Sequence, residues 1–269
     1  MRRLLEIAAL GVIQGAAELL PVSSSAHVAA LPRLLGWEIA GWDAARRKEL
    51  EVALHAGAAL ALAPEFLRLL PDARTLALAL GPPVVVGYAL EEWIEERAGG
   101  LWLGLIAGAV ALAAADSRAR RSEADAASGV AGTSGAAGVS GPSGADGAGR
   151  ATQREALALG LAQAAALVPG VSRTGATLAA ARSLGRSRAD ASRLSFGVAG
   201  PVLVGATALK AWRARRAADP RLLVGVVTAF ASARAALKLV GLERTERWWP
   251  YAAERLALAI LVVRYGRDR

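Results

Sequence analysis

Apolar residues in this chain form long blocks that are separated by short polar or arginine-rich stretches. A surface helix of a soluble domain would show a single apolar stripe, whereas these blocks are apolar on every face. Several of them approach the roughly 20 residues that cross the hydrocarbon core of a bilayer. The blocks are residues 50–70, 75–93, 101–115, 156–168, 194–212, 222–240 and 251–263. The pattern predicts an all-α polytopic membrane protein with about six transmembrane helices.

Composition supports this prediction and removes several classes of site. Of the 269 residues, 54% are hydrophobic. The chain has no cysteine and two histidines, which excludes disulfides, cysteine-ligated metals and a histidine-rich metal centre. The formal net charge of +9 comes almost entirely from arginines between the apolar blocks, where they can contact anionic headgroups. Because no basic face with stacking aromatic residues is present, we expect no nucleic-acid partner.

Glycine, serine and alanine dominate residues 117–150 and mark a break in composition. Glycine occupies every third position from Gly129 to Gly147, but the segment holds a single proline, Pro142, so a collagen helix is not expected. The composition predicts a flexible connector. It divides the chain into a first half (1–116) and a second half (151–269).

The two halves repeat each other around a helix break. Each half runs from an apolar segment into a break with a proline and serines, at residues 18–27 and at residues 169–177. If each break is a re-entrant helix pair, three spans separate the pairs. Because three is odd, the pairs enter from opposite faces, and their tips can meet inside the protein. The repeated residues are Gly11, Gln14 and Ser23 in the first half and Gly160, Gln163 and Ser172 in the second, each pair 149 positions apart.

The two breaks carry polar groups that suit phosphoryl transfer. The first supplies a carboxylate from Glu18, an imidazole from His27 and hydroxyls from Ser23, Ser24 and Ser25. Ionisable residues inside membrane segments are costly and therefore indicate function. Hydroxyls and the free backbone N–H groups of a helix start can bind phosphate oxygens.

The second break adds Ser172, Arg173, Thr174 and Gly175. Arginine suits phosphate because its planar fork donates two parallel hydrogen bonds. Structural roles stay open for several of these residues: the three serines of the first break could cap a helix, and Glu18 could pair with an arginine. His27 could be an interhelical hydrogen-bonding residue, and Arg173 could lie at a membrane interface. Inverted repeats with broken helices also occur in transporters, so a carrier of phosphorylated lipids or other anions is an alternative function, and a structural scaffold is a third.

The segment from Glu18 to His27, followed by Pro169 to Thr177, resembles the bacterial undecaprenyl-diphosphatase family associated with bacitracin resistance. The resemblance covers the chain except for the connector. It implies hydrolysis of undecaprenyl diphosphate to undecaprenyl phosphate and phosphate, in the recycling of the carrier lipid for cell-wall synthesis. It also implies a divalent cation, Mg²⁺ or Ca²⁺, and an inner-membrane fold with two re-entrant helix pairs.

Motif positions of the family carry over to four catalytic residues in this sequence. These are Glu18, Ser24, His27 and Arg173, with Ser24 or a water as the attacking group and His27 as the proton carrier. Gln14 stands where some members have a second glutamate, so the resemblance implies a cation at Glu18 with or without the Gln14 amide oxygen.

Several details of the resemblance remain expectations. Thr174 replaces a common serine, and Ala17 and Leu19 replace residues that usually flank the glutamate. A serine pathway requires His27 within hydrogen-bond reach of Ser24. The family favours a site open to the extracytoplasmic face, whereas arginines at both ends of the spans give no clear orientation. The sequence leaves open whether the chain forms a homodimer.

Overall fold

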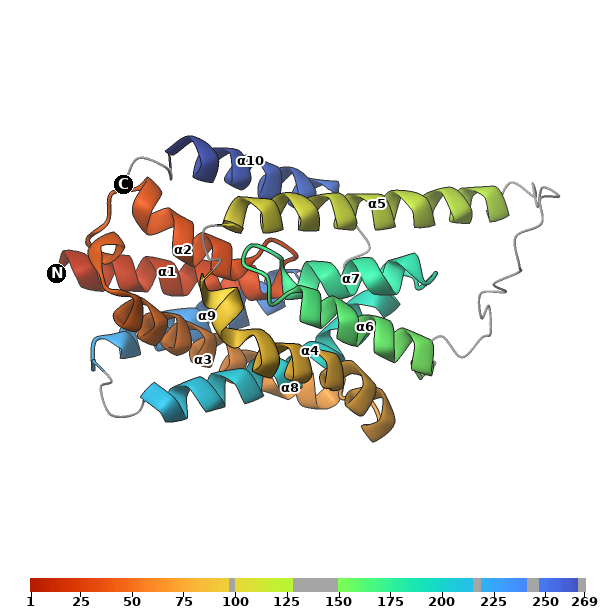
Figure 1. Ribbon diagram of the computed structural model, residues 1–269, viewed down its shortest axis with the longest axis horizontal. Helices are drawn as coiled ribbons and strands as arrows, with labels where there is room; N and C mark the ends of the chain where they lie inside the picture. The colour runs from red at the N-terminus through yellow and green to blue at the C-terminus, as the bar shows by residue number, and fades with distance from the viewer. Residues whose placement is uncertain (97–99, 128–149, 215–218, 241–246, 266–269) are drawn as a thin grey trace.

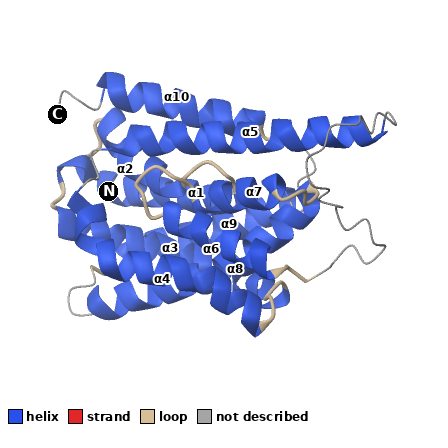
Figure 2. Ribbon diagram, turned by 45° about the vertical axis from the view of Figure 1, so that its right-hand side comes forward, coloured by secondary structure: helices blue, strands red, loops and turns tan. Residues whose placement is uncertain are grey.

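Helices account for the regular structure of the described part of the chain, apart from one short 3₁₀ element (Figures 1 and 2). The computed structural model describes residues 1–96, 100–127, 150–214, 219–240 and 247–265. No strand occurs among them. The elements are α1 (Arg2–Leu19), α2 (Ser24–Leu34), η1 (Glu38–Gly41), α3 (Ala44–Arg68), α4 (Ala73–Glu96), α5 (Leu101–Ala127), α6 (Gln153–Ala165), α7 (Arg173–Ser183), α8 (Arg188–Ala214), α9 (Leu222–Val240) and α10 (Trp249–Tyr265).

The helix contacts of the first half are repeated in the second half. If α1 to α5 are matched in order with α6 to α10, the packing of α1 on α9 corresponds to that of α6 on α4. The packing of α2 on α10 likewise corresponds to that of α7 on α5, while the pairs α3–α8 and α5–α10 map onto themselves. In Figure 1, α1 and α2 lie toward one end of the molecule and α6 and α7 toward the other. The fold is an inverted repeat with two re-entrant helix pairs.

Five helices are long and apolar enough to cross a membrane, as judged over the described residues. They are α3, α4 and α5 in the first half and α8 and α9 in the second. By the correspondence with α5, α10 takes the place of the sixth span, although it has only 17 residues. The two short pairs, α1–α2 and α6–α7, turn back inside the bundle.

Helix α5 corrects the predicted start of the connector. Its apolar block ends at Ala115, but the helix continues to Ala127 and takes in residues 117–127, which were expected to be flexible. Asp116 lies at this point, buried, and its carboxylate accepts two hydrogen bonds from Arg188 at 2.8 and 2.9 Å. This charged pairing carries the helix beyond its apolar part. Residues 128–149 of the predicted connector lie outside the described residues.

Two further pairs of equivalent residues support the repeat. Gly36 and Gly185, 149 positions apart, follow the second helix of each re-entrant pair with φ of 62° and 88°. This left-handed conformation favours glycine. Glu6 and Glu155, also 149 positions apart, tie the first helix of each pair to the chain beyond the second. Glu6 accepts the backbone N–H groups of residues 38 and 39, and Glu155 binds Arg186 at 2.6 Å.

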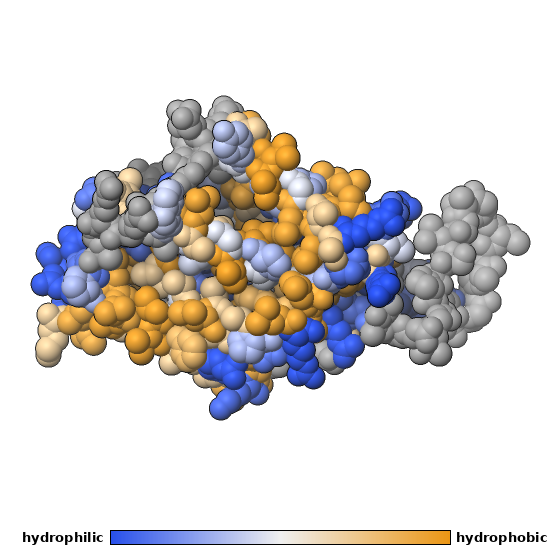
Figure 3. Space-filling model, turned by 90° about the horizontal axis from the view of Figure 1, so that it is seen from below, coloured by the Kyte–Doolittle hydropathy of each residue, from blue (hydrophilic) through white to orange (hydrophobic). Residues whose placement is uncertain are grey.

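Apolar residues cover much of the outside of the bundle as well as its core. Figure 3 shows them over the middle of one face. Large exposed side chains of this kind include Val84, Val85, Ile106, Val110 and Val227. An apolar exterior of this extent is expected where lipid rather than water surrounds the helices. The interior includes an apolar cluster between α1, α3, α8 and α9 and another between α4, α5, α6, α7 and α8, both rich in leucine and alanine.

Candidate active site

The first break separates α1 from α2 and owes its turn to Pro21 and Ser23. Leu20 is extended, with φ −96° and ψ 149°, as the residue before a proline prefers. Ser23 has φ 63°, and among the described residues it is the only one other than glycine with a positive φ. This conformation costs about 1–2 kcal/mol in an L-residue, and strained backbone of this kind clusters at functional sites. The turn places Ser24 in the first turn of α2.

The second break separates α6 from α7 and is built from a glycine and a helix cap. Gly170 has φ +90°, and a Cβ there would lie 2.1 Å from the carbonyl oxygen of Leu101. Only a glycine therefore fits between this break and α5. The Ser172 hydroxyl accepts a hydrogen bond from the Gly175 N–H at 3.1 Å and caps α7. Ser172, predicted to bind phosphate, is thus the N-cap of α7 in this structure.

Arg255 of α10 joins the two breaks. Its guanidinium donates from Nη1 to the carbonyl oxygen of Pro21 at 3.4 Å and from Nη2 to that of Gly170 at 3.0 Å. These two acceptors are equivalent positions of the repeat, 149 residues apart. Arg255 is 0% exposed, and Gly108 and Gly175 leave room for it: a Cβ at either would lie 2.1 or 2.7 Å from a guanidinium nitrogen. Both tips are therefore held by one side chain.

Glu18 gathers polar groups from both halves of the chain. The residue is 6% exposed and lies at the end of α1. Its Oε2 accepts hydrogen bonds from Gln14 Nε2 at 2.7 Å and from the Ser24 hydroxyl at 3.0 Å. Its Oε1 forms an ion pair with Arg173 Nη2 from the second break. His55 of α3 approaches with Nε2 4.0 Å from Oε2. The structure thus brings together Gln14, Glu18, Ser24 and Arg173.

Two polar atoms in this cluster are buried without a hydrogen-bond partner. They are Arg173 Nε, a donor, and Gln14 Oε1, an acceptor. Unpaired buried polar atoms are costly, so their presence in a native site calls for an explanation such as a missing ligand. Arg173 and His55 also line a cavity of about 120 Å³ between α3 and α8. The other polar groups on its wall come from Lys48, Glu51 and Thr207.

His27 has both ring nitrogens engaged away from Ser24. Nδ1 lies 2.9 Å from the carbonyl oxygen of Ser23, and Nε2 lies 2.8 Å from Oε1 of Glu254 on α10. The Ser24 hydroxyl donates to Glu18 instead. The expectation that His27 stands within reach of Ser24 as its base does not match this arrangement. The carboxylate of Glu18 is the group that can accept the Ser24 proton.

The remaining predicted residues lie around this cluster. The Ser23 and Ser25 hydroxyls are 3.4 Å apart, with Ser23 buried and Ser25 exposed. Thr174 is buried in the first turn of α7. Gly175 lies against the Arg255 guanidinium, so its position is explained by packing before any phosphate contact.

Four residues near the breaks were not proposed as site residues from the sequence: Lys48, His55, Glu254 and Arg255. Three of them are ionisable side chains within apolar blocks, and that placement alone could have marked them. His55 and Arg255 fall inside the blocks at 50–70 and 251–263. Their partners could not be read from the sequence, because Arg255 binds backbone carbonyl groups.

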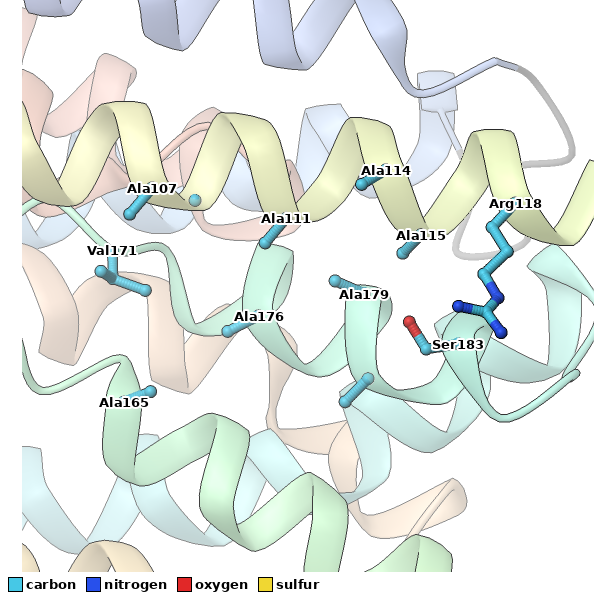
Figure 4. Close-up of a pocket in the computed structure, with 12 residues that line it drawn as sticks. Ala107, Ala111, Ala114, Ala115, Arg118, Ala165, Val171, Ala176, Ala179 and Ser183 are labelled. Carbon is cyan, nitrogen blue, oxygen red and sulfur yellow. The ribbon is translucent and has the colours of Figure 1, made fainter.

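An apolar groove of about 530 Å³ runs between α5, α6 and α7 (Figure 4). It begins beside Val171, next to the second break, and reaches Arg118 and Ser183. Its walls consist mainly of alanine side chains, so it offers smooth apolar surface with few polar atoms. The alanines include Ala107, Ala111, Ala114, Ala115, Ala176 and Ala179.

The cluster can contribute only part of the coordination shell of a cation. Among the described residues, no three His, Asp, Glu or Cys side chains gather as a metal site. The available donors are the Glu18 carboxylate and the unpaired amide oxygen of Gln14. Carboxylate and amide oxygens are ligands that Mg²⁺ and Ca²⁺ prefer, and Mg²⁺ usually takes its other ligands from phosphate and water. The residues therefore fit a cation that arrives with a phosphorylated substrate.

Comparison with known proteins adds an independent line of information. A family model described as bacitracin resistance protein BacA matches residues 7–261. Three proteins named undecaprenyl-diphosphatase are similar over nearly their full length. The one from Geobacter sulfurreducens is 32% identical over 97% of this chain and 98% of its own. Those from Trichlorobacter lovleyi and Bacillus cereus are 33% and 31% identical, covering 96% and 94% of the relative.

Proposed function

The chain belongs to the bacitracin resistance protein BacA family, and we propose that it hydrolyses undecaprenyl diphosphate to undecaprenyl phosphate and phosphate. The proposal places this membrane enzyme in the bacterial cytoplasmic membrane, in the recycling of the carrier lipid for cell-wall synthesis. It is supported by the names of relatives that are similar over nearly their whole length.

The observation that carries the proposal is the ion pair between Glu18 and Arg173. These residues are 155 positions apart and come from the tips of two different helix breaks. Arg173 also has an unpaired buried donor, Nε. Guanidinium groups bind phosphate through two parallel hydrogen bonds, so Arg173 has both the charge and the free donor for the terminal phosphate.

Binding of phosphate by Arg173 would change Glu18 as well. The Arg173 guanidinium balances the charge of the Glu18 carboxylate. When the guanidinium turns to phosphate oxygens, Oε1 of Glu18 is released from this ion pair. The Ser24 hydroxyl already donates to this carboxylate at 3.0 Å. Substrate binding would therefore leave Oε1 of Glu18 free while Oε2 still faces the Ser24 hydroxyl, so that Glu18 can act as the proton acceptor.

In the proposed first step, Ser24 Oγ forms a bond to the terminal phosphorus. The bond between that phosphorus and the bridging oxygen breaks, and undecaprenyl phosphate leaves with the bridging oxygen. The Ser24 proton passes to Glu18. Water oxygen then bonds to the phosphorus of the phosphoserine, the bond between phosphorus and Ser24 Oγ breaks, one water proton restores the Ser24 hydroxyl, phosphate leaves, and Glu18 gives its proton to solvent. Ser24→Ala should abolish turnover; retained turnover would instead assign the attack to a water held by Glu18.

We place the polyprenyl chain of the substrate in the apolar groove between α5 and α7. The groove starts at Val171, two residues before Arg173, and its alanine walls present no polar atom that a hydrocarbon chain would leave unpaired. Replacing Ala111 or Ala179 by tryptophan should raise KM for long-chain diphosphates and leave KM for short-chain analogues unchanged. An equal effect on both would remove the groove from the proposal.

The proposal includes a divalent cation, Mg²⁺ or Ca²⁺, held by Glu18 and the amide oxygen of Gln14. When bound, the cation supplies positive charge that offsets the charge of the diphosphate. Activity should be lost in a chelator and restored by either cation. Gln14→Glu adds a second carboxylate and should lower the cation concentration needed for half-maximal activity.

Release of phosphate from a polyprenyl diphosphate by the purified protein in detergent is the direct test. Wild-type protein should release one phosphate per lipid, with the polyprenyl monophosphate as the other product. In sealed liposomes the same reaction should proceed without net movement of lipid. Lipid movement without phosphate release would overturn the proposal in favour of a carrier.

We further propose that the active site opens to the extracytoplasmic face. Lys48, near the start of α3 and therefore near η1, lines the cavity beside Arg173. If the substrate enters the cavity at this end of the bundle, the end that holds η1 faces the extracytoplasmic side. The chain lacks cysteine, which makes single-cysteine labelling clean. In spheroplasts, Leu35→Cys near η1 should react with an impermeant maleimide, whereas Ser187→Cys should react only after lysis. The reverse pattern would invert the orientation.

A further inference from the structure

His27 lies between two hydrogen-bond acceptors. Its Nδ1 faces the carbonyl oxygen of Ser23 at 2.9 Å, and its Nε2 faces Glu254 Oε1 at 2.8 Å. A backbone carbonyl can only accept, so Nδ1 must carry a proton. When Glu254 is ionised its oxygen can only accept as well, and Nε2 then carries the second proton. The geometry is therefore that of an imidazolium ring paired with a carboxylate.

We infer that Glu254 is a positioning residue for His27, which fixes the ring and keeps it doubly protonated. The inference rests on the proposed function, because His27 is one of the residues that the family resemblance assigns to the reaction. This inference changes the role expected for His27. A ring with protons on both nitrogens carries a positive charge and can donate a proton, but it cannot accept one from Ser24.

The neighbours of Glu254 explain why this carboxylate is needed. Burial of the ring, and to a smaller degree the cation of the next residue, Arg255, lower the pKa of His27. The hydrogen bonds to Glu254 and to the Ser23 carbonyl group, together with the Glu254 charge, outweigh both effects and raise it. The second oxygen of Glu254, Oε2, is buried without a hydrogen-bond partner. In the described structure His27 is therefore the group to which this carboxylate is hydrogen-bonded.

Other charged groups near the short helix α2 are paired elsewhere. Helix α2 packs against α1, η1 and α10. On α1, Glu6 pairs with Arg2 and Glu18 with Arg173. On η1, Glu38 pairs with Arg3. The charged groups that act on His27 are thus the two α10 residues, Glu254 and Arg255.

The decisive experiment titrates His27 directly by NMR in detergent-solubilised protein labelled with ¹⁵N-histidine. The chain has two histidines, so the spectrum is simple, and His55→Gln assigns the signals. Glu254→Gln keeps a group that can donate to or accept from Nε2 but removes the charge. Because an opposite charge nearby shifts a titration by about 1–3 pH units, the midpoint of His27 should fall by at least about one unit.

Glu38→Gln is the matched control, because it removes an exposed carboxylate near α2 that does not contact His27. The titration midpoint of His27 in Glu38→Gln should equal that in wild type. An unchanged midpoint in Glu254→Gln would overturn the inference and leave Glu254 a hydrogen-bonding residue only. If Glu254→Gln does not fold, Glu254→Asp keeps the charge but withdraws it by one methylene and should give a smaller fall in the same direction.

Phosphate release gives the second readout. In Glu254→Gln, kcat should decline at lower pH than in wild type, by the shift seen in the NMR titration, while KM stays the same. A purely structural role would lower kcat equally at every pH. If wild-type protein released no phosphate, the proposed function would fail, yet the NMR midpoints would still decide whether Glu254 controls the charge of His27.

Discussion

The two helix breaks occupy equivalent places in the repeat but differ in what they contribute. Both carry a serine, Ser23 or Ser172, and both present a carbonyl group to Arg255. The first break reaches its turn through a strained serine, the second through Gly170. The shared features hold the tips together. They belong to the scaffold, which both halves had to keep for the tips to meet.

The chemistry, by contrast, is divided between the breaks. Glu18 has the apolar Leu167 as its counterpart, 149 positions on. Ser24 and Arg173 are counterparts of each other, and both contact Glu18. A single carboxylate near the axis of the repeat is thus contacted by the same position of both halves. The fold is thus repeated in the two halves, whereas the polar groups of the candidate site are not.

The largest expected effect is a difference in kcat between substitutions at Glu18 and at its counterpart, Leu167. Glu18→Gln should reduce kcat by about 10² to 10⁴, because it removes the proton acceptor of Ser24 and the partner of Arg173. Leu167→Gln places the same side chain at the equivalent position and should leave turnover close to wild type. Steady-state phosphate release from both variants checks the difference. Similar losses in the two would mean that the halves share the chemistry.

Arg255→Met should damage both breaks together. It leaves the carbonyl oxygens of Pro21 and Gly170 unpaired, at a cost of about 1–3 kcal/mol each. We expect a lower midpoint of thermal unfolding and a loss of activity in the protein that stays folded. Arg264→Met on the same helix removes an exposed arginine and should change neither. Intact stability in Arg255→Met would show that the tips hold together without it.

A smaller effect is expected from Arg173→Lys. Lysine keeps the charge but not the planar fork, and loss of one charge-assisted hydrogen bond, worth about 1.5–3 kcal/mol, predicts a fall in kcat/KM of about ten- to a hundredfold. Arg173→Ala should be worse. An arginine that only anchors the helix at a membrane interface would be replaced well by lysine, so wild-type kcat/KM in Arg173→Lys would remove Arg173 from the site.

The smallest effect on activity is expected from changes in the connector that joins the two halves. Replacing residues 128–149 by a short Gly/Ser linker should leave activity within a few-fold, since loop closure changes by about 0.6 kcal/mol per doubling of length. Extending the deletion to residues 117–149 should lower the stability of the protein. It removes Glu123, which binds the buried Arg182 at 2.5 Å. Thermal unfolding of both deletions distinguishes a linker from the helix end. Equal stability would make the last turns of α5 dispensable.

Apolar blocks and the repeated breaks predicted most of the architecture, because helix length and burial in lipid depend on local composition. For the candidate site, the sequence predicted the motif residues, and the contact of Arg173 with Glu18 followed from the two tips meeting. The end of α5 and the partner of His27 were not predictable. Both depend on charged residues far away in the chain, which local patterns do not pair.

Arg255 also bears on how the chain enters the membrane. On insertion scales, an arginine at the centre of a spanning helix costs about 2.5–3.5 kcal/mol, so α10, short and carrying Arg255, is a poor candidate to insert alone. Its acceptors, the carbonyl groups of Pro21 and Gly170, are synthesised earlier than α10 itself. We therefore expect α10 to insert last. It becomes stable in the bilayer once both breaks are in place and their carbonyl groups can accept hydrogen bonds from Arg255.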